Sequence, residues 1–127
     1  MKEFEELVQK ADWKKEKHVP VLTVQKTTEA VQVTVTVGKE ISHPNTTAHH
    51  IAWMEVYFLA TGSVFPYLIG RYDLAAHGAS PDGADTSTVY TEPTVVTNFK
   101  TEKPGTVYAL SYCNIHGLWA NKEKLEK

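Results

Sequence analysis

The chain has one cysteine among its 127 residues and therefore has no internal disulfide. Such cysteine usage is typical of a reducing compartment, and we expect a cytoplasmic protein. Excess positive charge is also absent: the formal net charge is -2, which argues against a nucleic-acid partner. No apolar run approaches the ~20 residues of a membrane helix, and the first residues lack the apolar core of a secretory signal, so we expect no membrane association.

What the sequence does contain is typical of a globular domain, with 42% hydrophobic and 22% charged residues. A chain of this length supports one sizeable core and leaves little room for a second. We therefore expect residues 1–127 to form a single domain.

Hydrophobic periodicity predicts mostly strands. Valines alternate with polar residues over 31–37, which is typical of a strand with one buried face. Residues 51–59 are apolar on both faces, which predicts a strand that is central or covered by a partner subunit. A short helix is expected over 3–12, and the Lys- and Glu-rich tail over 121–127 is expected to be a solvated surface segment. The period changes to two from Val19 onward, and further short strands are predicted at 65–72, 74–77, 89–90 with 95–99, and 106–113.

About seven short strands separated by turn residues, with almost no helix, favour one fold class. We predict an all-β protein, an immunoglobulin-like antiparallel β-sandwich of about seven strands with a short N-terminal helix or extension.

Five of the six histidines and the only cysteine fall into three short motifs. These are Glu-Lys-His-Val-Pro at 16–20, His-Pro-Asn-Thr-Thr-Ala-His-His at 43–50, and Cys-Asn-Ile-His-Gly-Leu-Trp at 113–119. A thiolate with several imidazoles selects iron, copper or zinc over magnesium or calcium. The sequence therefore predicts a metal centre that supplies the chemistry of the protein.

The third motif ends an apolar strand. Cys113 and His116 would point to opposite faces of a continuous strand, but the Asn114–Ile115 pair and Gly117 let the chain turn, so both side chains can reach one ion. A lone cysteine is more often buried and inert. The C-x-x-H spacing and the other histidines favour the ligand interpretation here.

The other histidines are less constrained by spacing. His43 precedes a proline and so lies at a strand end or turn. His49 and His50 enter a strand as neighbours, so one should face the site and the other away, and periodicity does not decide which. His18 could equally be an exposed loop residue, and His77, which has no partner motif, is interpreted as structural.

Together and in this order, the three motifs resemble the superoxide reductases of the small neelaredoxin type, the one-iron members of the desulfoferrodoxin family. The similarity continues between the motifs, through Ala-His-Gly at 76–78, Val-Tyr-Thr-Glu-Pro at 89–93 and Pro-Gly at 104–105, so it covers most of the chain.

The resemblance implies one non-haem iron per chain, cycling between Fe2+ and Fe3+. It implies four equatorial imidazoles and an axial thiolate, carried over by motif as His18, His43, His49, His116 and Cys113. It favours His49 over His50. The two-iron relatives have an additional domain with its own cysteines, which this chain lacks, so a single iron is expected.

Two further residues take roles from the resemblance. Glu16 is implied as the sixth ligand of the ferric state, and Lys17 as a positive charge and proton-bearing group near the open position. The chain departs from the family pattern at Ala48, where the second motif usually has glutamate. That position is not a ligand, so the site should survive, although local charge would differ.

The resemblance also implies an activity, the one-electron reduction of superoxide to hydrogen peroxide by an oxidoreductase. Electrons would come from a small redox protein such as rubredoxin, and the chain would form a homo-oligomer, a dimer or a tetramer. An axial thiolate pushes electron density onto the iron. Backbone N–H groups just after Cys113 are expected to donate hydrogen bonds to the sulfur and tune the potential.

Two other classes of protein could explain the cysteine and histidines. A cupredoxin-like electron-transfer copper protein also places Cys-x-x-His on a β-sandwich, but it normally adds a methionine shortly afterwards, and Gly-Leu-Trp-Ala follows at 117–120 here. A zinc-stabilised β-sandwich binding module would need four ligands, whereas three motifs offer five. A visible spectrum separates the three, because ferric thiolate absorbs red light, blue copper is intensely blue and zinc is colourless.

Overall fold

The computed structural model describes residues 2–126, which form one short helix and seven strands. Every paired strand runs antiparallel to its neighbours. The elements are α1 (Phe4–Leu7), β1 (Pro20–Lys26), β2 (Val31–Val37), β3 (Ile51–Ala60), β4 (Tyr67–Asp73), β5 (Thr94–Phe99), β6 (Gly105–Cys113) and β7 (Gly117–Leu125).

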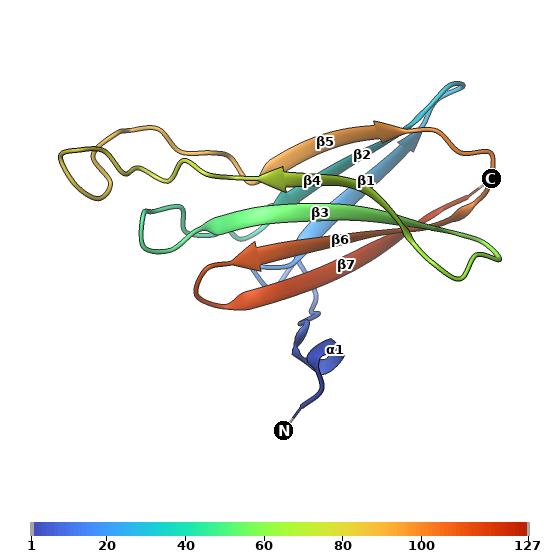
Figure 1. Ribbon diagram of the computed structural model, residues 1–127, viewed down its shortest axis with the longest axis horizontal. Coiled ribbons are helices and arrows are strands. Elements are labelled where there is room, and N and C mark those ends of the chain that lie inside the picture. Colours follow the sequence, from blue (N-terminus) through green and yellow to red (C-terminus); the bar gives the residue numbers. More distant parts are fainter. Residues whose placement is uncertain (1, 127) are drawn as a thin grey trace.

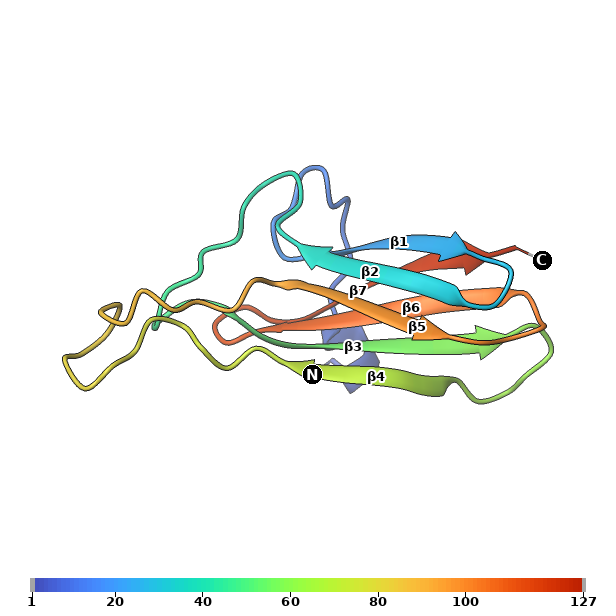
Figure 2. The same cartoon turned by 90° about the horizontal axis from the view of Figure 1, so that it is seen from above.

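The strands form two layers. One sheet has the order β1-β2-β5 and the other the order β4-β3-β6-β7. The strands of both sheets run along the long axis of the molecule (Figures 1 and 2). This is the two-sheet arrangement of immunoglobulin-like sandwiches, so the predicted fold class is confirmed.

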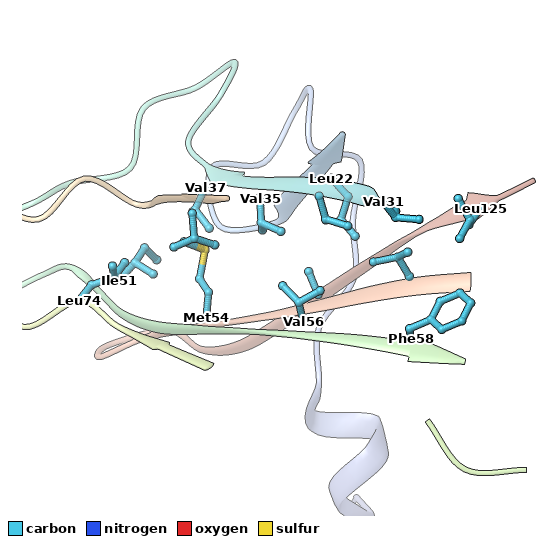
Figure 3. Packing of buried hydrophobic residues seen from close by; sticks show 14 of the residues in the cluster. Leu22, Val31, Val35, Val37, Ile51, Met54, Val56, Phe58, Leu74 and Leu125 are labelled. Atoms are coloured by element: carbon cyan, nitrogen blue, oxygen red, sulfur yellow. The ribbon is translucent and has the colours of Figure 1, made fainter. Parts of the chain in front are cut away.

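The core lies between the two sheets. Along β2 every second residue is buried, which places all four of its valines inward. The inward residues of β3 meet them from the opposite sheet, including Met54 and Val56, both fully buried (Figure 3). Burying one such aliphatic side chain stabilises the fold by about 1.5–3 kcal/mol. The strands therefore form a rigid frame for the loops at their ends.

Two sequence-based element predictions were wrong, and a third was incomplete. The helix predicted over 3–12 ends at Leu7, because Gln9 instead pairs with Trp119 at the edge of β7. In the tail predicted to be solvated, Lys122, Glu123, Lys124 and Glu126 are indeed exposed, but the segment also belongs to β7, which continues to the buried Leu125. Residues 74–77 and 89–90 form no strand and share only an isolated bridge between His77 and Tyr90.

One end of the sandwich gathers the three histidine-bearing motifs. β1, β3 and β7 begin there, and β2 and β6 end there (Figures 1 and 2). Two glycines with positive φ shape the connections: Gly117 (φ 83°) in the β6–β7 turn, and Gly38 (φ 85°) after β2. A Cβ on Gly38 would lie 2.7 Å from the backbone nitrogen of His43, so only glycine lets that loop approach so closely.

In the part of the chain that the structure describes, no helix is long and apolar enough to cross a bilayer.

Candidate metal centre

Strand register brings the motifs together. Ile51, at the start of β3, pairs with Cys113, at the end of β6, so the loop that carries His49 lies beside the cysteine. The backbone N–H of Asn114 donates to the carbonyl of His50 (3.2 Å), and the N–H of His50 donates to Oδ1 of Asn114 (2.8 Å). These bonds connect the second motif to the third.

The first motif is tied to the same sheet from the other layer. The buried hydroxyl of Ser111 donates to the carbonyl of His18 at 3.1 Å, and the Asn121 side-chain amide donates to the carbonyl of Pro20 at 2.9 Å. His18 is thereby held at the entrance to β1, directly over the end of β6.

Four imidazoles stand in a square, which we call the imidazole square: His18, His43, His49 and His116. Ring centroids of neighbours are 4.8 Å apart for His18–His43, His43–His49 and His18–His116, and 5.1 Å apart for His49–His116. The diagonal from His18 to His49 is longer, 6.5 Å. This is the arrangement of rings that surround one common point.

Cys113 completes the cluster. Its side chain is fully buried and free. One ligand atom from each of His18, His43, His49 and Cys113 lies within 4.8 Å of the other three. His116 joins them through Nδ1, which is 3.1 Å from Nε2 of His18 and 3.8 Å from Sγ of Cys113. All five residues that the family resemblance implied as ligands therefore lie together in one place.

Two ring nitrogens of the square, Nε2 of His43 and Nε2 of His49, are free to bind a cation. Nδ1 of His43 donates to the carbonyl of Pro44 at 2.6 Å, which leaves the lone pair on Nε2. Nε2 of His43 and Nε2 of His49 are buried and have no hydrogen-bond partner among the described residues. Buried polar atoms without a partner are costly. A metal ion would satisfy both, so the donor set fits a metal of the kind that binds imidazole and thiolate.

The local electrostatics also favour neutral imidazoles, the form that binds metal. Burial lowers the pKa of His18, of His49 and of His43, the last to about 4. The positive charge of Lys17 further lowers the pKa of all three, so this side chain acts on most of the cluster.

Glu16 sits behind His18. Its Oε1 accepts hydrogen bonds from Nδ1 of His18 and, at 2.8 Å, from the His18 backbone N–H. Burial raises the pKa of Glu16, but these hydrogen bonds outweigh it and the net pKa is lowered, so the carboxylate is ionised. In this arrangement the carboxylate holds the ring of His18 by the nitrogen that faces away from the square, as carboxylates commonly do for metal-binding histidines.

The remaining histidines lie outside the square. The ring of His50 stacks face to face on His77 with centroids 3.5 Å apart and an interplanar angle of 4°. His77 contacts Oδ1 of Asn45 through Nδ1 (3.0 Å), and its carbonyl accepts from Thr47 (2.7 Å). His77 thus supports the loop that carries His43 and His49, consistent with a structural residue. Ala48 is exposed and contributes only its carbonyl, which accepts from the side chain of Asn114 at 2.9 Å.

Sequence reasoning missed two neighbours of the cluster. Trp119 stacks on the ring of His18, with centroids 4.8 Å apart and an interplanar angle of 12°. Gln9 donates its side-chain amide to the carbonyl of His116 at 2.8 Å. Trp119 belonged to the quoted third motif, so its position three residues after His116 was a usable signal. Gln9 had none, because its contact depends on pairing between residues over a hundred positions apart.

The fold and these side chains define a class: a β-sandwich protein with a candidate centre for one metal ion, built from four imidazoles and one thiolate. The family model described as Desulfoferrodoxin matches residues 10–122. The chain belongs to the desulfoferrodoxin family.

Individual relatives agree with this family assignment. A superoxide reductase of Pyrococcus furiosus is 55% identical over 121 residues, covering 95% of this chain and 98% of the relative. A neelaredoxin of Megalodesulfovibrio gigas is 45% identical over 121 residues, covering 93% of each. The solved structure of a superoxide reductase (neelaredoxin) from Archaeoglobus fulgidus in the reduced form superposes with a TM-score of 0.92 at 59% identity, covering 95% of this chain and 99% of that one.

Proposed function

We propose that this chain is a superoxide reductase that holds one iron ion per chain at the imidazole square and Cys113. The observation that carries the proposal is the imidazole square itself, with the buried sulfur of Cys113 beside it, in a chain of the desulfoferrodoxin family. The reaction adds one electron and two protons to superoxide and yields hydrogen peroxide.

The proposed ligands are His18, His43, His49, His116 and Cys113. When bound, the iron supplies the electron, and its thiolate ligand increases the electron density available at the metal. The protein keeps the imidazoles neutral by burial and holds the sulfur in a dry environment. With these five residues as its ligands, a bound iron would have room to bind a small anion as well.

Glu16 and Lys17 are the proposed residues around that anion. Lys17 supplies positive charge that attracts superoxide and carries protons at its Nζ. Glu16 orients His18 as long as its carboxylate stays on Nδ1 of that ring. Ligation of ferric iron by Glu16, which the family resemblance implies, requires the carboxylate to leave His18.

We further propose that a rubredoxin-type protein delivers the electrons and that the chain works as a homo-oligomer, a dimer or a tetramer. The outer face of the four-stranded sheet supports the second point. A shallow hollow there is lined by large, half-buried apolar side chains, among them Tyr57, Leu59, Tyr108 and Leu110. Such a face on a sheet is suited to contact with a second subunit.

The same proposal covers the domain organisation of the chain and the compartment in which it works. Residues 1–127 act as a single iron-binding domain, since the family match covers nearly all of the chain. The protein works in the cytoplasm, where a reducing environment suits its one free cysteine.

Metal analysis with an optical spectrum tests the proposal. Protein purified without a tag should contain close to one iron per chain and, on oxidation, show a red-wavelength band that disappears on reduction. Stoichiometric zinc, with refusal of iron on reconstitution, would contradict the proposal, and so would an intense blue copper band.

A further inference from the structure

Trp119 is the one aromatic side chain in the described residues that stacks flat on a member of the imidazole square. It lies in β7, is only 8% exposed, and its ring runs nearly parallel to that of His18. It follows His116 by three positions, so the same short segment carries one proposed ligand and the ring on which another proposed ligand, His18, stacks.

The indole of Trp119 also contacts His116, the neighbour of His18 in the imidazole square. Its Nε1–H donates to the carbonyl of His116 at 3.3 Å. His18 and His116 are neighbours in the square, with Nε2 and Nδ1 only 3.1 Å apart. The Trp119 side chain therefore contacts His18 through the face of its ring and His116 through its N–H.

The other contacts of His18 do not fix the plane of its ring. Glu16 fixes the direction of Nδ1, and Ser111 fixes the backbone carbonyl. A hydrogen bond in the ring plane does not prevent the ring from rotating about that bond. Contact with a flat, buried indole does prevent it, since rotation would lose the stacking contact and open a void.

We propose that Trp119 is a positioning residue that sets the ring plane of His18 and holds the carbonyl of His116. It thereby controls how firmly the centre keeps its metal and the energy of its thiolate-to-iron absorption. This inference rests on the proposed iron site but concerns a residue outside the ligand set. Residues that support metal ligands typically change metal affinity by about 10–100-fold when replaced.

The test compares two positions in the full-length, iron-loaded protein. Trp119→Leu removes the flat face and the N–H, whereas Trp119→Phe keeps an aromatic face and removes the N–H. The matched controls are Trp53→Leu and Trp53→Phe. Trp53 is also stacked on an aromatic ring, that of Tyr112 (5.5 Å, 11°), and lies under Arg71, but it is not stacked on any ring of the imidazole square among the described residues.

Three quantities are measured for each variant: the rate of iron release to a chelator, the position of the ferric red band, and the melting temperature. We expect Trp119→Leu to release iron at least about tenfold faster than the parent, with a shifted band. Trp119→Phe should release it about fivefold faster, as expected for loss of one hydrogen bond. Both Trp53 variants should match the parent in release rate and band.

Parent-like release and an unshifted band in Trp119→Phe would overturn the proposal, even if Trp119→Leu failed to fold. Equal effects from Trp53 and Trp119 substitutions would also overturn it, because the change would then reflect general destabilisation. Failure of the proposed function looks different: the parent itself would not bind one iron per chain.

Discussion

The backbone N–H of His116 donates a hydrogen bond to Sγ of Cys113 across 3.4 Å. Cys113 is the last residue of β6 and His116 lies in the turn that follows it, and the Cys113 side chain has no exposure to solvent. A hydrogen bond to a buried thiolate withdraws electron density from the sulfur and so tunes a metal bound to it. The expectation that N–H groups just after Cys113 serve the sulfur is confirmed for this donor.

Cys113→Ser should keep the fold and lose the red band. The strands supply most of the core, and serine is nearly isosteric, but an alkoxide or hydroxyl gives no thiolate-to-iron transition. Reaction with superoxide should fall sharply, because the electron-rich thiolate donor would be lost. Circular dichroism checks the fold and the optical spectrum checks the ligand. A variant with the parent spectrum would show that Cys113 does not bind the metal.

His49→Ala and His50→Ala should differ clearly in iron content. His49 belongs to the imidazole square and its Nε2 has no other partner among the described residues, so its loss should release most of the iron. His50 stacks on His77 outside the square, so its replacement should leave the iron content unchanged. Metal analysis of the two purified variants decides between them. Iron loss from the His50 variant alone would mean that the two neighbouring histidines have been assigned the wrong way round.

Glu16→Ala and Glu16→Gln distinguish the two roles of this carboxylate. Both variants should leave the reaction with superoxide nearly as fast and should alter the resting ferric spectrum, since neither side chain can bind as a carboxylate. Glutamine can still accept from Nδ1 of His18, so only the alanine variant should also hold iron less firmly. Ferric spectra identical to the parent in both variants would count against ligation by Glu16.

Lys17→Ala should slow the second-order reaction with superoxide and flatten its dependence on salt. Superoxide is an anion approaching a protein of net charge -2, so local positive charge must guide it. Focusing of this kind raises association by ~10–1,000-fold and weakens with ionic strength. Lys15→Ala is the matched control, because it removes the same charge from an exposed neighbour. Pulse radiolysis at several ionic strengths compares them, and identical salt slopes for the Lys17 variant and the parent would remove Lys17 from the mechanism.

Acid should destabilise the metal-free protein between pH 6.5 and about 4. Burial lowers the pKa of His43 from 6.5 to about 4, so in this window the unfolded chain binds more protons than the folded chain. The free energy of unfolding therefore falls as the pH falls, by at most about 3 kcal/mol from this residue. His18 and His49 act in the same direction.

Urea unfolding of metal-free protein at pH 7, 5.5 and 4 measures this dependence. A His43→Gln variant, which cannot titrate, should show a shallower slope across the same window. A slope as steep as that of the parent would mean that burial of His43 does not contribute.

The sequence predicted those elements whose hydrophobic pattern is local. Alternation identified β2, and a long apolar run identified β3, because each buries a regular face. It failed at β7, whose second half is rich in Lys and Glu because it is an edge strand held by backbone pairing to β6. It also overextended α1, since pairing of Gln9 with the edge of β7 outweighs a weak helical preference.

At the candidate site, too, local patterns could be predicted and long-range relationships could not. Motif spacing indicated a metal centre, and the family resemblance implied which five residues meet there, but neither could give their order around the square or the stacking of Trp119 on His18. Those relationships depend on the register of β3 on β6 and on how the segment before β1 crosses the sheet edge. Neither is encoded in a short motif.

The yield of hydrogen peroxide from superoxide distinguishes superoxide reduction from dismutation. Fully reduced protein, in excess, is mixed with a known pulse of superoxide, so no electron donor has to be identified. We predict one hydrogen peroxide for each superoxide consumed and no release of dioxygen. One hydrogen peroxide for every two superoxide, with dioxygen formed, would indicate dismutation and contradict the assignment as a reductase.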